Sequence, residues 1–281
     1  MLIVDSQVHI WAGNTPERPW PKRPAVPHRP VPLAADELLK EMDGAGVARV
    51  VIVPPSWEGD YNDLALAAAK KHPTRFAVMG RLDPELPAAR ELLPAWREQP
   101  GMLGLRFHFA RPEYEAPLTE QRLDWVWAEA EKIGLPIMVI VDPRRLHLID
   151  RIAERHPELK LIMDHLAAHL GKKDAEAFGD LDNLLALARR PNVAVKASSL
   201  PACTSDSYPY RALHPVLRKV YDAFGPRRIF WGTDLSRLEC TYRQSITMFT
   251  EEIPWLSDND KEWIMGRGLC EWLDWPLPTA A

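Results

Sequence analysis

Short apolar runs alternate along the chain with segments in which apolar residues recur at helical spacing. The runs are rich in Val, Ile and Leu and are bounded by proline, glycine or polar residues, as expected of buried parallel strands. This pattern predicts eight strands, one within residues 1–11 and the others at 48–53, 75–80, 102–109, 136–141, 160–165, 193–196 and 229–231.

A helical pattern follows each strand, in some cases after a long loop. The predicted helices span residues 36–46, 61–72, 85–98, 119–133, 144–155, 175–190 and 210–224, with further helices after Glu239 and after Asp258. Alternation of this kind indicates a parallel sheet with right-handed crossovers, and eight units favour a closed (β/α)8 TIM barrel over an open sheet. No glycine-rich phosphate turn follows Val4, which argues against a dinucleotide-binding fold. We therefore expect residues 1–281 to form a single α/β domain.

A proline-rich loop is predicted at residues 14–33. Its prolines are too dense for a helix or a ladder strand, and they stand at Pro16, Pro19, Pro21, Pro24, Pro27, Pro30 and Pro32. The same loop carries an excess of basic residues over Glu17, namely Arg18, Lys22, Arg23, His28 and Arg29. Two interpretations stay open: a solvated loop that wraps the surface, or a stiff lid that offers positive charge to an anionic ligand.

Composition narrows the class of protein. The chain is 46% hydrophobic with a net charge of -4, which fits a globular protein and gives no reason to expect a nucleic-acid partner. No apolar run reaches the roughly 20 residues that cross a bilayer, and the beginning of the chain does not resemble a signal peptide. The widely spaced Cys203, Cys240 and Cys270 suggest neither a disulfide framework nor a CxxC site, so we expect a cytoplasmic location.

The first strand alternates polar and apolar residues. Period-two alternation would place Asp5, Gln7 and His9 on one face. Val4, Val8 and Ile10 would then lie on the other face. A buried face with a carboxylate, an amide and an imidazole is costly unless it performs chemistry or is fully hydrogen-bonded.

Active sites of TIM barrels lie at the carboxyl ends of the strands. The polar or aromatic residues at those ends are Asp5, Gln7, His9, Ser56, Trp57, Arg81, Asp83, Arg106, His108, Asp142, Asp164, His165, Lys196, Ser198, Ser199, Thr233 and Asp234. Asp83 and Asp142 each precede proline and are most simply turn or cap residues. The three histidines among these residues, together with Asp234, form a group that is harder to explain by structure alone.

These motifs resemble the amidohydrolase superfamily, specifically the amidohydrolase-2 branch of lactonases and related decarboxylases. The resemblance runs from Asp5 to Trp275, and the motifs that carry it are Asp5–Trp11, Gly101–His108, Asp164–Ala167, Val195–Lys196 and Trp231–Asp234. The family signature in the first strand is Asp-x-His-x-His, and here Gln7 stands in place of its first histidine. Many metal-dependent relatives also have a histidine after the fifth strand, where this chain has Asp142. Glutamine is not a usual zinc ligand, so we expect no metal. The alternative is one divalent Zn or Mn ion at His9 and Asp234.

The resemblance implies a hydrolase that acts on a lactone or a related cyclic or activated carbonyl compound. Asp234 would be the general base, and His9 and His165 would polarise the carbonyl, with Gln7 as a further donor. Arg106, helped by His108 or the basic loop, would hold a substrate carboxylate. Trp11 and Trp57 would line an apolar wall for a flat ring. The expected partner is thus a small anionic molecule, and the sequence leaves open whether the protein forms a homo-oligomer.

Two other functions stay open at this point. One is metal-dependent, non-oxidative decarboxylation of an aromatic or unsaturated acid. The other is a catalytically silent barrel that binds a small acid.

Overall fold

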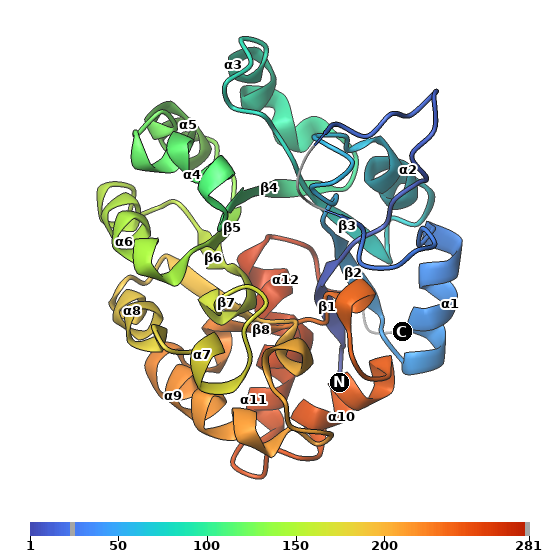
Figure 1. Ribbon diagram of the computed structural model, residues 1–281, viewed down its shortest axis with the longest axis vertical. Coiled ribbons are helices and arrows are strands. Elements are labelled where there is room, and N and C mark those ends of the chain that lie inside the picture. Colours follow the sequence, from blue (N-terminus) through green and yellow to red (C-terminus); the bar gives the residue numbers. More distant parts are fainter. Residues whose placement is uncertain (23–25, 279–281) are drawn as a thin grey trace.

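Eight parallel strands form one sheet in the order in which they occur along the chain (Figure 1). The computed structural model describes residues 1–22 and 26–278. The strands are β1 (Val4–Val8), β2 (Arg49–Ile52), β3 (Phe76–Gly80), β4 (Met102–Phe109), β5 (Ile137–Val141), β6 (Leu161–Met163), β7 (Val193–Ala197) and β8 (Ile229–Trp231). Every neighbouring pair from β1–β2 to β7–β8 is parallel.

Helices surround this sheet as an outer ring (Figure 1). They are α1 (Ala35–Ala45), α2 (Asp63–Lys71), α3 (Ala89–Leu92), α4 (Pro112–Thr119), α5 (Asp124–Lys132), α6 (Leu146–Arg155), α7 (Asp174–Ala177), α8 (Leu181–Ala186), α9 (His214–Phe224), α10 (Tyr242–Thr250), α11 (Asp258–Glu262) and α12 (Gly268–Trp272). Within the described ranges, no helix has the length and hydropathy that crossing a bilayer requires.

The last strand returns to the first and brings the barrel to closure. The backbone N–H of Asp234, just after β8, donates to the carbonyl of Gln7 in β1 at 2.9 Å. The carboxylate of Asp5 accepts from the backbone and hydroxyl of Thr233, and from the hydroxyl of Tyr242 at 2.8 Å. These bonds join the two ends of the sheet, and the predicted (β/α)8 barrel is confirmed.

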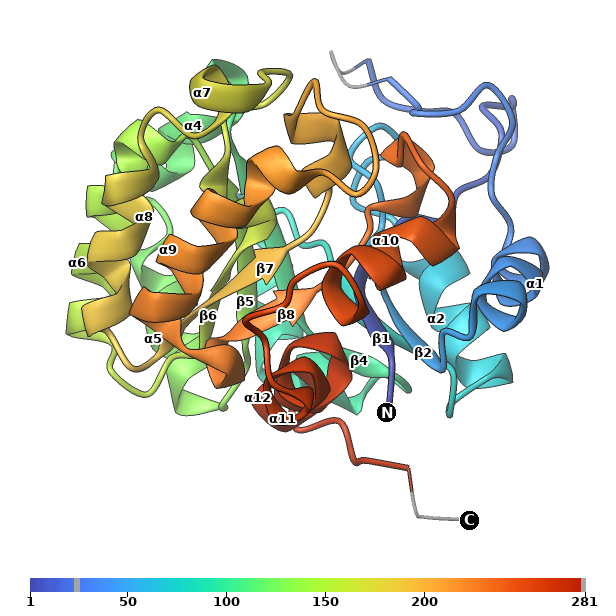
Figure 2. The ribbon, with the colours of Figure 1, turned by 90° about the horizontal axis from the view of Figure 1, so that it is seen from below.

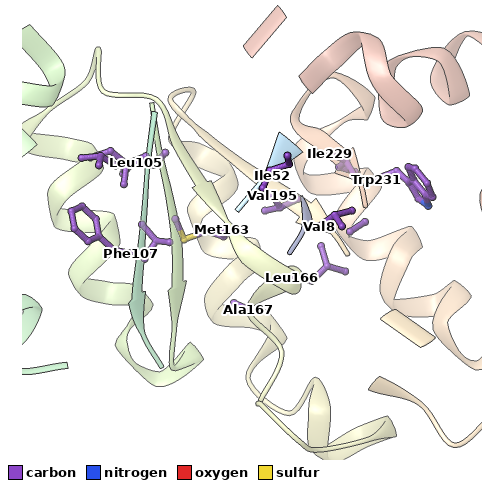
Figure 3. Close-up of a cluster of buried hydrophobic side chains, with 14 of the residues drawn as sticks. Val8, Ile52, Leu105, Phe107, Met163, Leu166, Ala167, Val195, Ile229 and Trp231 are labelled. Carbon is purple, nitrogen blue, oxygen red and sulfur yellow. The ribbon is translucent and has the colours of Figure 1, made fainter. Parts of the chain in front are cut away.

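The hydrophobic core has two parts. The larger part lies between the strands and the helices and includes Val8, Leu105 and Trp231 (Figure 3). The smaller part fills the barrel, where Val4 and Phe230 pack in one cluster with residues of α12. Figure 2 shows α12 beneath the strands, at the end opposite the proline-rich segment. Because α12 closes the amino-terminal end, the carboxyl-terminal end is the one left for a pocket.

A bulge in β1 overturns the predicted alternation of that strand. Its register against β2 shifts between Asp5 and Val8, where β1 has one residue more than its partner. The extra residue changes which way the side chains point. Val4 therefore packs inside the barrel, whereas Val8 packs against the helices, so the two do not share a face. Asp5 bonds to Thr233 and Tyr242, and only Gln7 and His9 of the three polar residues reach the pocket.

Several predicted helices are shorter or broken, with prolines in or beside them. The helix expected at 85–98 is α-helical only over Ala89–Leu92, after which Pro94 lies in a 3-10 segment, Leu93–Glu98. The helix expected at 119–133 begins at Asp124, and a separate helix that we did not predict, α4, precedes it. Gly179 lies between α7 and α8, which together occupy much of the helix predicted at 175–190. Strand β6 ends at Met163, because His165 to Ala167 adopt positive φ.

The described parts of the segment 14–33 form no helix, and their one bridge joins Thr15 and Arg18. Arg23 and Pro24 lie outside the described residues. Arg18 pairs with Glu58 and Asp63, and Arg29 pairs with Glu41. These ion pairs hold the segment against the barrel. The charges of Arg18 and Arg29 are therefore engaged with carboxylates of the chain, whereas the lid interpretation had them facing a ligand.

Candidate active site

A pocket opens at the carboxyl-terminal end of the barrel, with a cavity of about 200 Å³. It collects side chains from strand ends that are distant in sequence, together with the proline-rich segment. The lining includes Gln7, His9, Val26, His28, Ser56, Trp57, Arg106, His108, Arg111, Ile140, His165, Leu170, Asp234 and Arg237. Seven of the eight residues predicted for the site line this cavity, and Trp11 does not.

Asp234 is the carboxylate at the centre of this group. Its backbone adopts φ 53°, which turns the chain directly after β8 into a short 3-10 segment, Leu235–Arg237. Oδ1 lies 3.3 Å from Nε2 of His9, and Oδ2 lies 4.0 Å from Nε2 of His165. Asp234 is the only carboxylate among the described residues that line the cavity. It is therefore the group best placed there to accept a proton.

The hydrogen bonds of the two histidines fix what each ring offers to the pocket. Nδ1 of His9 lies 2.6 Å from the carbonyl of Val53. A carbonyl can only accept, so Nδ1 carries the hydrogen, and burial lowers the pKa of His9 to about 3, which keeps the ring neutral. Nε2 of His9 therefore presents a lone pair to Asp234.

His165 has the opposite arrangement. Its Nδ1 lies 2.8 Å from the hydroxyl of Ser198, which can donate to it, and its Nε2 faces the carboxylate of Asp234. The carboxylate favours a hydrogen on Nε2. Burial lowers the pKa of His165 to about 4, so this ring is a neutral donor toward the pocket.

A buried ion-pair network lies beneath the cavity. The ammonium of Lys196 is 2.7 Å from Oδ1 of Asp164, and Nε of Arg106 donates to Oδ2 of the same carboxylate at 3.1 Å. Burial raises the pKa of Asp164, but the charges of Lys196 and Arg106 outweigh it and lower the pKa to about 2. Asp164 thus stays ionised and holds both cations in place, which is a supporting role.

Gln7 belongs to the same network. Lys196 donates a hydrogen bond to Oε1 of Gln7, so the amide oxygen is already engaged as an acceptor. Nε2 of Gln7 is buried and has no hydrogen-bond partner among the described residues. The side chain therefore offers an N–H donor where a metal ligand would offer a lone pair.

Aromatic residues and His108 form one side of the cavity. Trp57 lines it and meets Trp11 edge to face, with ring centroids 5.4 Å apart, so Trp11 supports Trp57 from outside the cavity. His108 lies beside Arg106, and burial lowers its pKa to about 2. A neutral His108 can offer a substrate anion a hydrogen bond but no charge.

Three basic residues that line the cavity were not among those predicted for the site. Arg111 and Arg237 add positive charge near the mouth, and His28 enters from the proline-rich segment. The first two lie in loops a few residues beyond a strand end, outside the strand-end positions from which the site was predicted. His28 was recognised only as part of a basic loop, because no sequence rule places residue 28 beside residue 234.

His28 completes a group of three metal-binding side chains with His9 and Asp234. The ligand atoms of these residues all lie within 4.8 Å of one another. Nδ1 of His28 is 2.9 Å from the hydroxyl of Ser236, and its ring meets that of Trp57 at 4.7 Å. Burial lowers the pKa of His28 to about 3, so the ring is neutral.

Comparisons with known proteins agree with this architecture. The sequence model of the family described as "Amidohydrolase" matches residues 4–267. The chain is 24% identical to 4-sulfomuconolactone hydrolase of Hydrogenophaga intermedia, over 82% of this chain and 73% of that protein. It is 26% identical to L-fucono-1,5-lactonase of Burkholderia ambifaria, over 84% of this chain and 81% of that one. An amidohydrolase from Burkholderia multivorans, solved with bound zinc, superposes with a TM-score of 0.80 at 20% identity, over 98% of this chain and 100% of that chain.

Proposed function

This chain belongs to the amidohydrolase family, and from that premise we propose that it hydrolyses a lactone or a related activated carbonyl compound that carries a carboxylate. The observation that carries the proposal is the position of Asp234. One carboxylate lies between two neutral histidines, in a cavity that Arg106, Arg111 and Arg237 also line. Two relatives named for lactone hydrolysis support the substrate class.

The reaction begins with water next to Asp234. The carboxylate takes a proton from the water while the oxygen of the water bonds to the lactone carbonyl carbon. The tetrahedral intermediate then collapses, the ring C–O bond breaks, and Asp234 returns the proton to the leaving oxygen. The product is a hydroxy acid, and Asp234 ends in the form in which it began.

The carbonyl oxygen needs hydrogen-bond donors as negative charge develops on it. Nε2 of Gln7 and Nε2 of His165 are two donors close to Asp234 that can provide these bonds. His9 donates through Nδ1 to Val53, so in its neutral form it can polarise a carbonyl only through a cation bound at Nε2. Gln7 thereby takes over part of the role that the sequence predicted for His9.

Positive charge at the cavity selects an anionic substrate. Asp164 fixes Nε of Arg106, and Arg111 and Arg237 approach from the loops. A second hollow of about 240 Å³ also has Arg106 and His108 in its lining, so an extended substrate has room beyond the first cavity. Trp57 provides a flat apolar surface for a ring.

The residues of the site also fit a divalent metal. Oδ1 of Asp234 is buried and receives no hydrogen bond from the described part of the chain, and two neutral imidazoles lie beside it. Two nitrogen atoms and one carboxylate oxygen form a usual zinc donor set. His9, His28 and Asp234 would hold the ion, which would supply Lewis-acid polarisation and a more acidic water. The steps above use only groups of the chain, and we propose that turnover needs no metal.

Decarboxylation is the second candidate, and the donor group of His9, His28 and Asp234 is the observation that favours it. An assay of the purified protein on lactones and on aromatic and unsaturated acids, with and without chelator, separates these reactions. We expect ring opening without carbon dioxide release, in the presence of chelator as well as in its absence. Metal-dependent release of carbon dioxide would favour decarboxylation. Absence of turnover of every compound would favour a protein that only binds a small acid.

We also propose a cellular location for the protein. Cys203, Cys240 and Cys270 are unpaired, which supports the cytoplasmic location predicted from the sequence. Self-association stays a prediction that a measurement of molecular mass in solution would test.

A further inference from the structure

Glu58 is a carboxylate buried directly behind the aromatic wall of the cavity. It follows Trp57 in the loop after β2, and its side chain is 2% exposed. The described residues that line the cavity include Trp57 but not Glu58. Burying a charged group is costly unless hydrogen bonds and an opposite charge compensate for the lost water. The partners of Glu58 therefore indicate its role.

Two other segments of the chain meet at one oxygen of Glu58. Oε1 accepts a hydrogen bond from the backbone N–H of Ala12 at 3.0 Å and another from Nε of Arg18 at 3.0 Å. Ala12 directly follows Trp11, just as Glu58 directly follows Trp57. The bond to Ala12 therefore joins the backbone beside one tryptophan to the side chain beside the other, and the two indole rings meet edge to face.

Arg18 connects this carboxylate to helix α2. Its two terminal nitrogens donate to both oxygens of Asp63, the first residue of α2, at 2.6 and 2.9 Å. The guanidinium also lies over the ring of Tyr61, 5.0 Å from the centroid. A paired contact of this kind fixes direction as well as distance. The position of the Glu58 side chain is thus set from the outer ring of helices.

The ring of Trp57 depends on its surroundings for its orientation. Its Nε1 is buried and has no hydrogen-bond partner among the described residues, so no polar contact of the indole fixes the ring. The ring meets those of His28 and His9 at 4.7 and 5.7 Å, and that of Trp11 at 5.4 Å. Neighbouring rings and the adjacent backbone therefore hold it, and Glu58 fastens the backbone beside Trp11.

We propose that Glu58 is a positioning residue that holds Trp57 and Trp11 as one rigid pair, and thereby sets the affinity of the site for flat rings. The inference rests on the proposed function, because it takes Trp57 as the wall against which the substrate lies. Glu58 touches no reacting atom, and proton transfer stays with Asp234. Loss of Glu58 should therefore weaken binding of the substrate and of the transition state equally, which raises KM and leaves kcat unchanged.

The test compares two carboxylates, benzoate and acetate, that differ in the presence of a ring. Benzoate can lie against Trp57, whereas acetate reaches only the basic groups of the cavity. In the full chain carrying Glu58→Ala, the dissociation constant of benzoate, measured by ligand-observed NMR, should rise at least ~5-fold. That of acetate should stay within about 2-fold of the wild-type value, because the basic groups are unchanged.

Two matched variants show whether the hydrogen bonds of Glu58 are the cause. Glu58→Gln should bind benzoate nearly as the wild type does, because an amide oxygen of the same shape still accepts from Ala12. Glu129→Ala removes a carboxylate that pairs with Lys132 on helix α5, and it should leave both affinities unchanged.

Arg18→Ala keeps the test decisive if Glu58→Ala does not fold. It removes one partner of Glu58 and leaves the bond to Ala12, so it should weaken benzoate binding in the same direction by a smaller factor. In a Trp57→Ala background, Arg18→Ala should have no further effect on benzoate, because the wall through which it acts is gone.

Several outcomes would overturn the proposal. They are equal losses of acetate and benzoate affinity, a full additional effect of Arg18→Ala in the Trp57→Ala background, and a wild type that binds benzoate no more tightly than acetate. On a lactone substrate, a fall in kcat of Glu58→Ala in place of a rise in KM would also overturn it. A wild type that prefers benzoate but opens no lactone would contradict the proposed reaction and leave this inference standing.

Discussion

Lys196 donates a hydrogen bond to the amide oxygen of Gln7, so the amide nitrogen of Gln7 is the atom presented to the pocket. Gln7 therefore acts as a hydrogen-bond donor at the position where the family resemblance led us to expect a histidine. Without the buried ammonium, nothing in the site would favour this orientation of the amide over the reverse.

Gln7→Glu should test that donor. The substitution keeps the shape of the side chain and the contact with Lys196, but it replaces the N–H group by a carboxylate oxygen that repels a developing oxyanion. We expect kcat to fall by about 10²–10³-fold, the usual effect of losing one such donor. Steady-state kinetics and a thermal melt measure the effect on activity and on the fold.

Gln99→Glu serves as the control for that change. Gln99 caps the carbonyl of Trp96 before β4, at the other end of the barrel, so its replacement should leave turnover unchanged. Wild-type kcat in Gln7→Glu would show that Gln7 does not stabilise the transition state.

Asp234→Asn should lower kcat/KM by at least ~100-fold, because an amide cannot accept the proton of the attacking water. The fold should persist, because the bond from Asp234 to Gln7 is made by the backbone. Asp222→Asn, which removes an exposed carboxylate paired with Arg218, should keep full activity. A near-normal rate in Asp234→Asn would remove this residue from its role as base.

Asp164 should contribute to the pH dependence of stability. Its pKa is about 2 in the folded chain and 3.8 without the fold, so its stabilising effect is complete above pH 3.8 and is lost as pH falls toward 2. The pKa difference corresponds to roughly 2 kcal/mol. The free energy of unfolding, measured with urea, should therefore fall between pH 5 and pH 2 by roughly 2 kcal/mol more in the wild type than in Asp164→Asn.

The control for this measurement is Asp124→Asn, which removes an exposed partner of Arg155. It should follow the wild-type pH dependence closely, because exposed ion pairs contribute little. The same pH dependence of the free energy of unfolding in the wild type and in Asp164→Asn would contradict the conclusion that Asp164 is ionised in the folded chain.

Gly232→Ala should destabilise the barrel where β8 meets β1. A Cβ at this position would overlap with the hydroxyl oxygen of Ser6 and approach Oδ1 of Asp5 to 3.1 Å. We expect a loss of about 1–3 kcal/mol in the free energy of unfolding, as for other overpacked sites. Gly44→Ala in α1, where a Cβ meets nothing within 4 Å, should instead be neutral or stabilising.

Apolar runs were sufficient to predict the barrel, because the strands are buried on both sides and most of them read as predominantly apolar runs. The run at 102–109 even coincides with β4. Strand ends then identified His9, His165 and Asp234, since closure of a barrel brings all its carboxyl ends together. These residues lie in one cavity, and their catalytic roles stay predictions.

Other features depend on contacts that a periodic pattern does not contain. The bulge between Asp5 and Val8 adds one residue to a strand without changing its composition, so strict alternation assigned Asp5 to the wrong side. His28 reaches Ser236 across 208 positions, through a loop whose path is set by ion pairs of its arginines. Burial of Lys196 likewise follows from the barrel interior rather than from its neighbours in sequence.

The bonds from Thr233 and Tyr242 to Asp5 join positions more than 220 residues apart. They cannot form on the ribosome until the chain beyond position 242 has emerged, and they close a very long loop. Such distant contacts slow folding. The same event brings Asp234 to His9, so the last step of folding and the first moment of catalytic competence should coincide.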